Sequence, residues 1–498
     1  MNIPSKATIL VIGGGPAGSY ASIVLAREGF NVVLLEATKF PRYHIGESLL
    51  PSVRRFMQFI DAEDLVVAHG FTPKPGAAVK LNQHNREGYT DFVSAGPQNG
   101  SWNVIRSEFD DLLLTYASKS GVSVFQETKV TEIHFEGPDN IRPVKASWLA
   151  QNGAQGQIHF DYLVDASGRN GLMSIKYLKN RAFNQSLKNT ACWGYWSGTD
   201  LYKPGTTREN AMNPVMDKDI ASRKKKLYDI ENHDEKLHAF YLDELKHAPG
   251  AIKLIGNGVL RTRPGESAIK TTSDFSYCAS QHAGDHFRIA GDAGDPFFSS
   301  GVHLALTGAL SAALTVAASI RGTASEANAS RWHDSKVGTA YTRFLIVVLS
   351  TYKQIRNQNT AIMSDINEDN FDRAFELLRP VIWGAADVDK TLTQEELQKT
   401  MDFCCNVFTP TDPEMYEAVG ARLDPALLQP HGPILTEVEI DKLLDQDDFE
   451  AKAVLSKVNA RKPIHAMVDP EMDFASETHY GLNAVIERGR LGLVASAA

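Results

Sequence analysis

A glycine-rich turn near the start of the chain is the first segment whose residue pattern suggests a binding role. Its small residues are Gly13, Gly14, Gly15, Ala17 and Gly18, which follow the pattern G-x-G-x-x-G. Glycines allow a tight turn and let backbone N–H groups approach a pyrophosphate, which binds at the N-terminus of the following helix. Glu36 lies at the distance typical of an acid that accepts a hydrogen bond from a ribose hydroxyl. These residues predict a dinucleotide site.

Three elements must hold this turn in place. Ala7–Ile12 is a short apolar run with β-branched residues, which predicts a buried parallel strand. Ser19–Glu28 has the periodicity of an amphipathic helix, and Asn31–Leu35 predicts a second strand that ends at Glu36. A glycine pattern alone is weak evidence, but strand, turn, helix, strand and acid in this order are the context that the fingerprint requires.

Two later segments return to the same predicted site. Phe160–Val164 is an apolar strand followed by Asp165-Ala166-Ser167-Gly168-Arg169, and Phe287–Ala290 leads directly into Gly291-Asp292-Ala293. A simple nicotinamide module does not return so late in the chain. The three segments together resemble the FAD-binding core of the flavoprotein monooxygenase superfamily, in which the late Gly-Asp carboxylate holds the FAD ribitol. Alone, Asp292 would be interpreted as an ordinary turn residue after a strand.

Within that superfamily the chain is most similar to the flavin-dependent halogenases, in particular the fungal phenol halogenases that act on aromatic polyketides. The nearest subgroup includes mushroom enzymes that chlorinate the orsellinate-type ring of melleolide sesquiterpenoid esters. The resemblance covers most of the chain. It is carried by residues 40–48 (FPRYHIGES), 71–77 (FTPKPGA), 86–92 (REGYTDF), 102–106 (WNVIR), 295–302 (DPFFSSGV), 352–356 (YKQIR) and 371–375 (FDRAF).

The resemblance implies a reaction and a set of contacts. In the family, reduced flavin and O2 give a flavin hydroperoxide, which chloride attacks to form hypochlorous acid. Chloride is expected at Ser300 and Gly301, where N–H groups at a helix start suit a halide, although the same residues could simply cap the helix that Val302–Ile320 predicts. The implied FAD contacts are Gly13, Gly14, Gly15, Ala17, Gly18, Glu36, Arg42, Glu47, Arg106, Asp292 and Val302.

Lys74 is the residue that the resemblance makes catalytic. In the family a lysine at this place hydrogen-bonds hypochlorous acid, or carries its chlorine as a chloramine, and presents it to the substrate ring. From its neighbours alone, a lysine between two prolines would be a solvated loop residue, and Lys80 is the nearest alternative lysine. Phe298 stands where tryptophan halogenases carry a glutamate, which favours a phenolic substrate but is also compatible with plain packing.

Two departures from the family pattern concern the site. The family's W-x-W-x-I-P signature is absent, because none of the six tryptophans has that spacing, and the chain passes almost directly from Asn210 to Asp219. Only Gly294 separates Ala293 from Asp295, where relatives have several residues. A gene model that skipped coding segments, a degenerate copy and a genuine variant with compensating geometry are the three explanations.

Composition narrows the remaining classes. The 498 residues carry a net charge of −9, which makes nucleic acid an unexpected partner. The four cysteines lack disulfide-scaffold or metal spacing, so we expect no metal and no secreted fold. No signal peptide or membrane span is predicted, since the longest apolar runs, such as Leu345–Leu349, are short. Composition therefore favours a cytoplasmic protein. The family resemblance implies a small phenolic substrate, and a separate NAD(P)H-dependent flavin reductase is expected because the chain has no second nicotinamide fingerprint.

These inferences combine into one expected architecture. The fold class is α/β, an FAD-binding Rossmann-like fold of the monooxygenase and halogenase type, with a mixed-sheet substrate domain and a helical C-terminal region. Residues 1–330 would form a discontinuous FAD core (about 1–60, 104–190 and 282–330) interleaved with a substrate-binding sheet (about 61–103 and 191–281), and 331–498 the helical region. An FAD-dependent aromatic hydroxylase on the same fold, or an inactive relic, are the alternatives.

Overall fold

The computed structural model describes most of the chain. The described residues are 2–79, 88–93, 96–137, 141–183, 190–210, 234–262, 267–273, 277–296, 301–356, 411, 413–429, 432–435, 437–445, 447–468, 474 and 477–496. Several predicted features lie outside them, so their predictions stay as they are. These are the chloride residue Ser300, the substrate-side Phe298, the alternative lysine Lys80 and the 371–375 motif.

A central sheet of eight strands positions the predicted cofactor site. Its strand order is β17-β18-β10-β1-β2-β7, and β9 joins β8 to the long strand β10. β1 lies between β10 and β2 and runs parallel to both. The strands are β1 (Lys6–Ile12), β2 (Val32–Leu35), β7 (Ser123–Phe125), β8 (Thr128–Glu136), β9 (Arg142–Ala150), β10 (Gln155–Asp165), β17 (Ala283–Gly284) and β18 (Phe287–Ile289).

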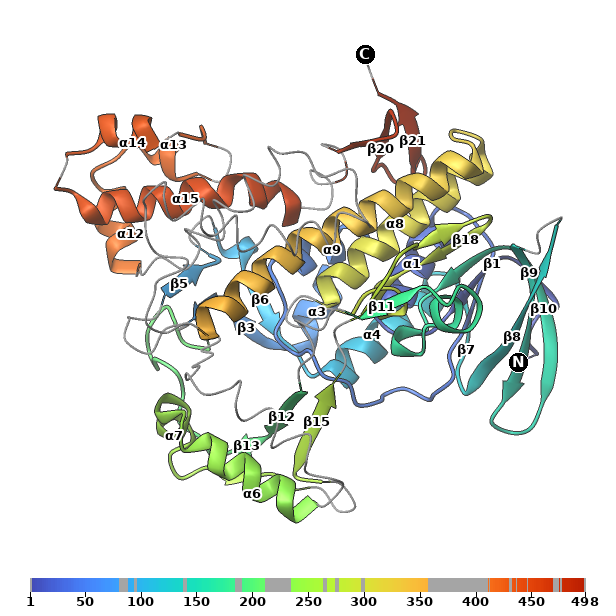
Figure 1. Ribbon diagram of the computed structural model, residues 1–498, viewed down its shortest axis with the longest axis horizontal. Coiled ribbons are helices and arrows are strands. Elements are labelled where there is room, and N and C mark those ends of the chain that lie inside the picture. Colours follow the sequence, from blue (N-terminus) through green and yellow to red (C-terminus); the bar gives the residue numbers. More distant parts are fainter. Residues whose placement is uncertain are drawn as a thin grey trace.

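Helices α1 (Pro16–Arg27), α4 (Arg106–Lys119) and α8 (Gly301–Arg321) cover one face of this sheet (Figure 1). The smaller helices α2 (Ser52–Phe59) and α3 (Glu63–His69) pack beside them. By length and composition α8 could cross a membrane, but 94% of its most apolar window is buried inside the protein. Its apolar character is therefore explained by its place in the core between α1 and α9 (Glu326–Arg356).

The part of the chain predicted to bind substrate has smaller sheets. In the described residues its strands form five two-stranded antiparallel pairs, one of which joins β16 to β11 of the predicted FAD core, and α6 (Asp234–Leu245) and α7 (Pro249–Ile255) lie at its outer edge (Figure 1). The pairs are β3 (Thr72–Lys74) with β6 (Ser101–Asn103), β4 (Gly76–Val79) with β5 (Gly88–Asp91), β11 (Arg181–Phe183) with β16 (Tyr277–Ala279), β12 (Thr190–Gly194) with β15 (Ile269–Ser273), and β13 (Trp196–Ser197) with β14 (Val259–Leu260).

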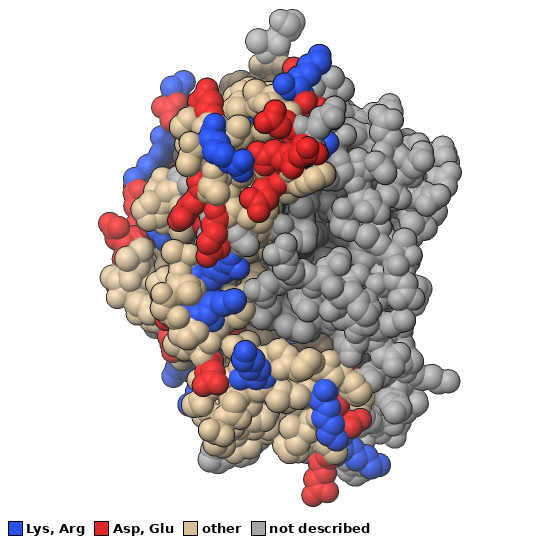
Figure 2. Space-filling model, turned by 90° about the vertical axis from the view of Figure 1, so that its left-hand side faces the viewer, with Lys and Arg blue, Asp and Glu red and all other residues tan. Residues whose placement is uncertain are grey.

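The C-terminal segment contains helices and also a small sheet that the sequence pattern does not predict. The helices α12 (Pro413–Gly420), α13 (Pro425–Leu428), α14 (Glu437–Leu443) and α15 (Phe449–Val468) form their own cluster. The strands β19 (Thr478–His479), β20 (Leu482–Val485) and β21 (Gly492–Ala495) pack against α8, and Trp332 Nε1 donates to the carbonyl of Leu482 at 3.1 Å. Acidic side chains gather over the part of the surface formed by α12–α15, with basic side chains among them (Figure 2).

Candidate functional site

The turn after β1 has the close contacts that its glycines predict. Gly13 has a φ of +102°, and a Cβ atom there would overlap the carbonyl oxygen of Ala166. A Cβ atom at Gly18 would overlap the carbonyl oxygen of Gly13. Side chains are therefore excluded at both positions, and the turn lies against the segment that follows β10.

The N-terminus of α1 is open to an anion. Its N-cap is Gly15, which supplies no capping side chain, and Pro16 follows at the first helical position. The helix begins at Pro16 rather than at the predicted Ser19, because proline's fixed φ suits the first turn. Arg42 Nη2 lies 3.4 Å from where a Cβ atom of Gly15 would be. Unpaired N–H groups beside a guanidinium fit a pyrophosphate.

Glu36 holds the turn directly. Its Oε2 atom accepts the backbone N–H of Gly14 at 2.6 Å, and its Oε1 atom accepts both the N–H and the hydroxyl of Thr38, at 2.8 and 2.7 Å. The sequence pattern predicts a contact of Glu36 with ribose and misses both of these partners. The ribose contact stays a prediction, and a carboxylate fixed in this way is oriented for it.

Arg106 and Asp110 form a buried pair next to the same turn. Arg106 Nε and Nη2 donate to the two oxygens of Asp110 at 2.8 and 3.1 Å, and Arg106 Nη1 donates to the carbonyl of Ile45 at 2.9 Å. Arg42 Nη1 lies 3.6 Å from the same carboxylate. Sequence reasoning selected both arginines and missed Asp110, although the spacing i, i+4 on a predicted helix is a signal for such a pair.

Glu47 is hydrogen-bonded to a residue of the predicted substrate-binding sheet. Its Oε2 atom accepts the hydroxyl of Tyr195 at 3.1 Å, and this hydroxyl also lies 3.1 Å from that of Tyr43. Trp193 Nε1 donates to Tyr43 at 3.0 Å. Burial raises the pKa of Glu47, while the Tyr195 hydrogen bond opposes that shift. The predicted FAD-contacting loop and the segment at β12 are thus connected by a continuous chain of hydrogen bonds.

Asp292 comes to the first turn from the far end of the chain. It lies in the 3-10 turn Gly291–Ala293, directly after β18. A Cβ atom at Gly291, whose φ is +64°, would lie 3.1 Å from the Cβ of Ala17. The late Gly-Asp segment therefore meets the start of α1, as the sequence predicts.

The carboxylate of Asp292 is available to a ligand. No side chain in the described part of the molecule donates a hydrogen bond to it. Burial raises its pKa to about 6, although the guanidinium groups of Arg106, Arg169 and Arg181 act in the opposite direction. A carboxylate in this position can accept hydrogen bonds from hydroxyl groups such as those of a ribitol chain. Together with the open start of α1, it makes the residues present a fit for FAD.

Lys74 is a buried residue, contrary to the solvated-loop interpretation. It lies on β3, only 3% exposed, because β3 pairs with β6 and brings Lys74 opposite Ser101. Its Nζ atom donates to the carbonyl of Leu49 at 3.0 Å and lies 5.3 Å from the centre of the Phe92 ring. Burial lowers the pKa of Lys74 to about 8. The amine can therefore change its charge near neutral pH.

The same segment connects Lys74 to the start of α8. The carbonyl of Leu49 accepts the hydrogen bond from Lys74. Three residues later, Oγ of Ser52 lies 2.9 Å from Nδ1 of His303 on α8. Gly301 begins this helix, and a Cβ atom there would meet no atom within 4 Å. Val302 is buried. Lys74 and the first turn of α8 are therefore both hydrogen-bonded to residues 49–52.

The fold also joins residues that sequence spacing keeps apart. The ligand atoms of Cys278, His282 and Asp295 all lie within 4.8 Å of one another. Burial lowers the pKa of His282, but the carboxylates of Asp295 and Asp334 outweigh it and raise this pKa to about 10. Sequence spacing gives no sign of this group, because Asp295 reaches the other two residues from beyond β18, and the expectation of no metal stays a prediction.

Comparison with known proteins places the chain among halogenases. Residues 8–104 match the family model described as tryptophan halogenase. The chain is 54% identical to the flavin-dependent halogenase armH1 of Armillaria mellea, over 99% of each chain. It is 43% identical to the sulochrin halogenase gedL of Aspergillus terreus, over 99% of this chain and 94% of that one. The crystal structure of CmlS, a flavin-dependent halogenase, has the same fold, with a TM-score of 0.67 at 22% identity, over 99% of this chain and 84% of that one.

The alignment lengths also bear on the shortened segments. The match to armH1 extends over 523 positions, so at least 25 of them face gaps in this 498-residue chain. Because the match covers 99% of each chain, these gaps interrupt a similarity that otherwise extends along the whole sequence. A cofactor turn with the geometry for FAD, the matching fold and identity of this level over the whole chain establish that this protein belongs to the flavin-dependent halogenases.

Proposed function

We propose that this chain uses FADH2, O2 and chloride to chlorinate an electron-rich phenolic ring of the orsellinate or aromatic-polyketide type, with melleolide-type sesquiterpenoid aryl esters as candidate substrates. In this proposal it acts in the cytoplasm in secondary-metabolite biosynthesis and takes reduced flavin from a separate NAD(P)H-dependent reductase. The support comes from the Armillaria relatives and from a relative named as a sulochrin halogenase.

The predicted FAD-contacting residues would hold the cofactor between the start of α1 and the turn that carries Asp292. The open N–H groups at the start of α1 and Arg42 suit the pyrophosphate, and Asp292 suits the ribitol hydroxyls. Bound FAD, supplied reduced, provides the reaction of O2 and chloride that yields hypochlorous acid. The start of α8 at Gly301, together with Ser300, is the proposed place for chloride.

The observation that carries the proposal is the environment of Lys74. A lysine amine buried on β3, held by one backbone carbonyl and an aromatic face, has N–H bonds left to donate. As an ammonium it would hydrogen-bond the oxygen of hypochlorous acid while the ring carbon takes the chlorine. The oxygen then leaves as water with the proton that the ring loses. Residues 49–52 position the amine relative to α8.

Aromatic hydroxylation is the second candidate reaction. The absence of the W-x-W-x-I-P signature favours it, since that segment is thought to keep substrate from reacting directly at the flavin. The burial of Lys74 opposes it, because oxygen transfer from the flavin needs no amine at that place. The two reactions differ in the mass of the product, one by a chlorine and the other by an oxygen.

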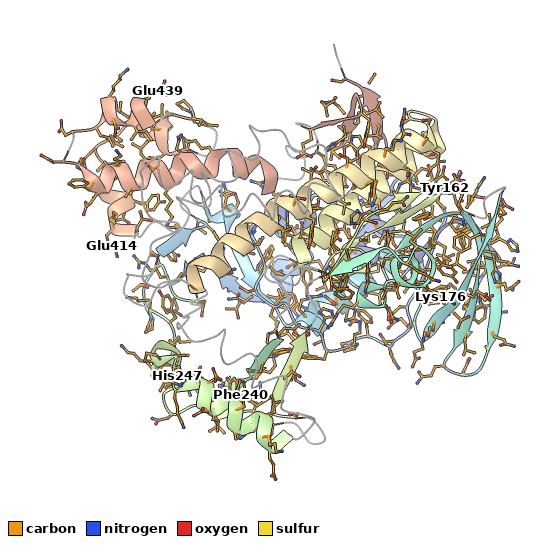
Figure 3. All side chains as sticks on the ribbon, viewed as in Figure 1. Tyr162, Lys176, Phe240, His247, Glu414 and Glu439 are labelled. Atoms are coloured by element: carbon orange, nitrogen blue, oxygen red, sulfur yellow. The ribbon has the colours of Figure 1, made fainter. Side chains whose placement is uncertain are left out.

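The test is Lys74→Ala, with Lys176→Ala as the matched control. Lys176 donates to the carbonyl of Thr131 beside the β8–β9 ribbon, far from β3 (Figures 1 and 3). We expect Lys74→Ala to bind FAD and consume reduced flavin normally but to lose at least about a hundredfold in chlorination. Lys176→Ala should chlorinate like the wild type. Retained regiospecific chlorination by Lys74→Ala would remove the lysine from the mechanism.

A further inference from the structure

A largely buried cluster lies next to the turn that carries Asp292, and the backbone N–H of Asp295 donates to the carbonyl of Gly291. Cys278 comes from β16, His282 from the loop before β17, and Asp295 from the segment after the 3-10 turn. His282 and Asp295 are 2% and 7% exposed, and Nε2 of His282 lies 2.5 Å from Oδ2 of Asp295. The thiol completes the group, with all three ligand atoms within 4.8 Å. Sulfur, imidazole nitrogen and carboxylate oxygen are the ligand types that zinc takes in proteins.

The outer side of the imidazole is held by a second carboxylate. Oδ1 of Asp334, on α9, lies 3.3 Å from Nδ1 of His282 and accepts the backbone N–H of the same residue at 2.5 Å. Metal-bound histidines typically donate their other ring N–H to a carboxylate, which fixes the tautomer and the ring orientation. With Nδ1 held by Asp334, Nε2 of His282 is directed at Asp295.

A small cavity opens beside the cluster. It has a volume of about 20 Å³ and is lined by His282, Asp295, Thr307 and Tyr341 together with apolar side chains such as Leu304 and Val337. Thr307 is 2% exposed, and its Oγ1 atom has no hydrogen-bond partner in the described part of the chain. The cavity is mostly apolar, and this unpartnered hydroxyl is one of its few polar groups, so it marks the place for a bound water or another oxygen ligand.

The shortened segment before Asp295 makes the cluster compact. A Cβ atom at Gly294 would lie 2.8 Å from Cδ2 of His282, so only glycine lets the imidazole lie against the chain here. Asp295 is fixed on its other side, where Oδ1 accepts the backbone N–H of Ala279 at 2.9 Å. The short spacing thus brings the carboxylate to the two other ligands.

We propose that Cys278, His282 and Asp295 bind a zinc ion, with a water in the cavity as the fourth ligand and Asp334 as the carboxylate that orients His282. The exchange is balanced: one Zn²⁺ enters, and two protons leave, one from the Cys278 thiol and one from the His282–Asp295 hydrogen bond. The net charge of the cluster does not change. The ion would fasten the turn that carries Asp292, so its role is structural.

A second group of possible ligands serves as an internal comparison. Asp285, His286 and Glu326 also lie within ligand distance of one another. Glu326, however, is already paired with Arg288, whose Nη1 and Nη2 donate to its two oxygens at 2.8 and 3.2 Å. A cation there would compete with a buried guanidinium, so we assign no metal to it.

The experiment measures zinc bound to the purified holoenzyme after incubation with zinc chloride and removal of unbound ions. The variants are Cys278→Ser and Asp334→Asn, with Cys192→Ser as the matched control at the other described free cysteine. We expect one zinc per chain in the wild type and Cys192→Ser, none in Cys278→Ser, and a 10- to 100-fold weaker affinity in Asp334→Asn, roughly the effect typical of such an orienting carboxylate.

Zinc X-ray absorption of the wild type supplies a readout that does not depend on folding of the variants. One sulfur at about 2.3 Å with nitrogen and oxygen at about 2.0–2.2 Å would support the site. No bound zinc in the folded wild type, zinc without a sulfur ligand, or zinc that Cys278→Ser retains would each overturn it. In those cases the cluster is a hydrogen-bonded ion pair of His282 and Asp295 and holds no metal.

Discussion

The cofactor side and the substrate side of this protein are built in different ways. Around the cofactor turn, one eight-stranded sheet and three long helices bury their apolar side chains almost completely. The predicted substrate side consists of two-stranded pairs, and large apolar side chains such as Leu201 and Val259 are 53% and 68% exposed. The predicted substrate side is also where the sequence departs from the family pattern between Asn210 and Asp219. The cofactor turn is thus supported by a continuous core, whereas the described part of the predicted substrate side has none of comparable size.

The largest effect is expected from a side chain added to the cofactor turn, where the structure leaves no room for one. In Gly18→Ala the new methyl group would overlap the carbonyl oxygen of Gly13, so α1 must move away from the turn. We expect no FAD to remain bound after gel filtration and a loss of about 1–3 kcal/mol of unfolding free energy. Gly338→Ala on α9, where a Cβ atom meets nothing within 4 Å, should retain FAD. Flavin absorbance and thermal melting measure both effects.

The ion pair at the junction of the two regions comes next. In Asp295→Asn, His282 loses its buried charged partner, so we expect a loss of about 3–5 kcal/mol when zinc is chelated. The control is Asp285→Asn, which removes the partly exposed partner of His286 and should cost less than about 1 kcal/mol. Urea unfolding gives both values. Equal losses in the two variants would contradict a special role for the buried pair.

The core of the cofactor side should also be sensitive to acid. Burial lowers the pKa of both His303 and His333 to about 3, with further lowering by Lys336 and Arg288 respectively. Their folded pKa lies below the unfolded value of 6.5, so the unfolded state takes up the protons first. Stability is full above pH 6.5 and falls as the pH drops toward 3, by up to about 1.4 kcal/mol per pH unit for each histidine. A flat stability profile between pH 6.5 and 5 would contradict this.

The hydrogen bond between the two regions should have a smaller effect. Tyr195→Phe removes the hydroxyl that donates to Glu47, which we expect to cost about 1–1.5 kcal/mol. Since Glu47 lies on the predicted FAD-contacting loop, FAD should also bind several-fold more weakly. Tyr480→Phe, at a tyrosine that is 58% exposed, is the control. Unchanged FAD affinity in Tyr195→Phe would show that the two regions act independently.

The pH dependence of chlorination should separate the two roles considered for Lys74. Burial lowers the pKa of Lys74 to about 8, so its ammonium form predominates below that pH and its free amine above it. If the ammonium donates to hypochlorous acid, chlorine transfer per flavin oxidised falls as the pH rises through about 8. A yield that rises through the same range would instead support the chloramine. The measured quantity is the amount of chlorinated product formed per flavin oxidised, with hydrogen peroxide as the product of unproductive flavin oxidation.

Local patterns predicted the cofactor side well. The strands and helix around the first turn, the late Gly-Asp segment and α8 follow from apolar periodicity and glycine spacing over a few residues. Contacts between distant segments could not be obtained in this way. The burial of Lys74 depends on the pairing of β3 with β6, and the cluster around His282 depends on segments that meet only after β18 has joined the sheet.

The C-terminal sheet shows the same limit. β19, β20 and β21 are two to four residues long, too short for an alternating pattern to be recognised, and they form because they pair with one another and pack on α8. The helical interpretation of that segment lacked this tertiary information. Short strands are defined by their partners rather than by their own residues.

Chlorine transfer to a phenol is the proposed activity that most needs a test, because the sequence departs from the family pattern between Asn210 and Asp219. The test is mass spectrometry of the product formed by the purified protein with a flavin reductase, NADH, FAD, O2, chloride and an orsellinate-type phenol. We expect a product with the chlorine isotope doublet from the wild type and none from Lys74→Ala. A product with one added oxygen and no doublet, or no product from protein that binds FAD, would contradict it.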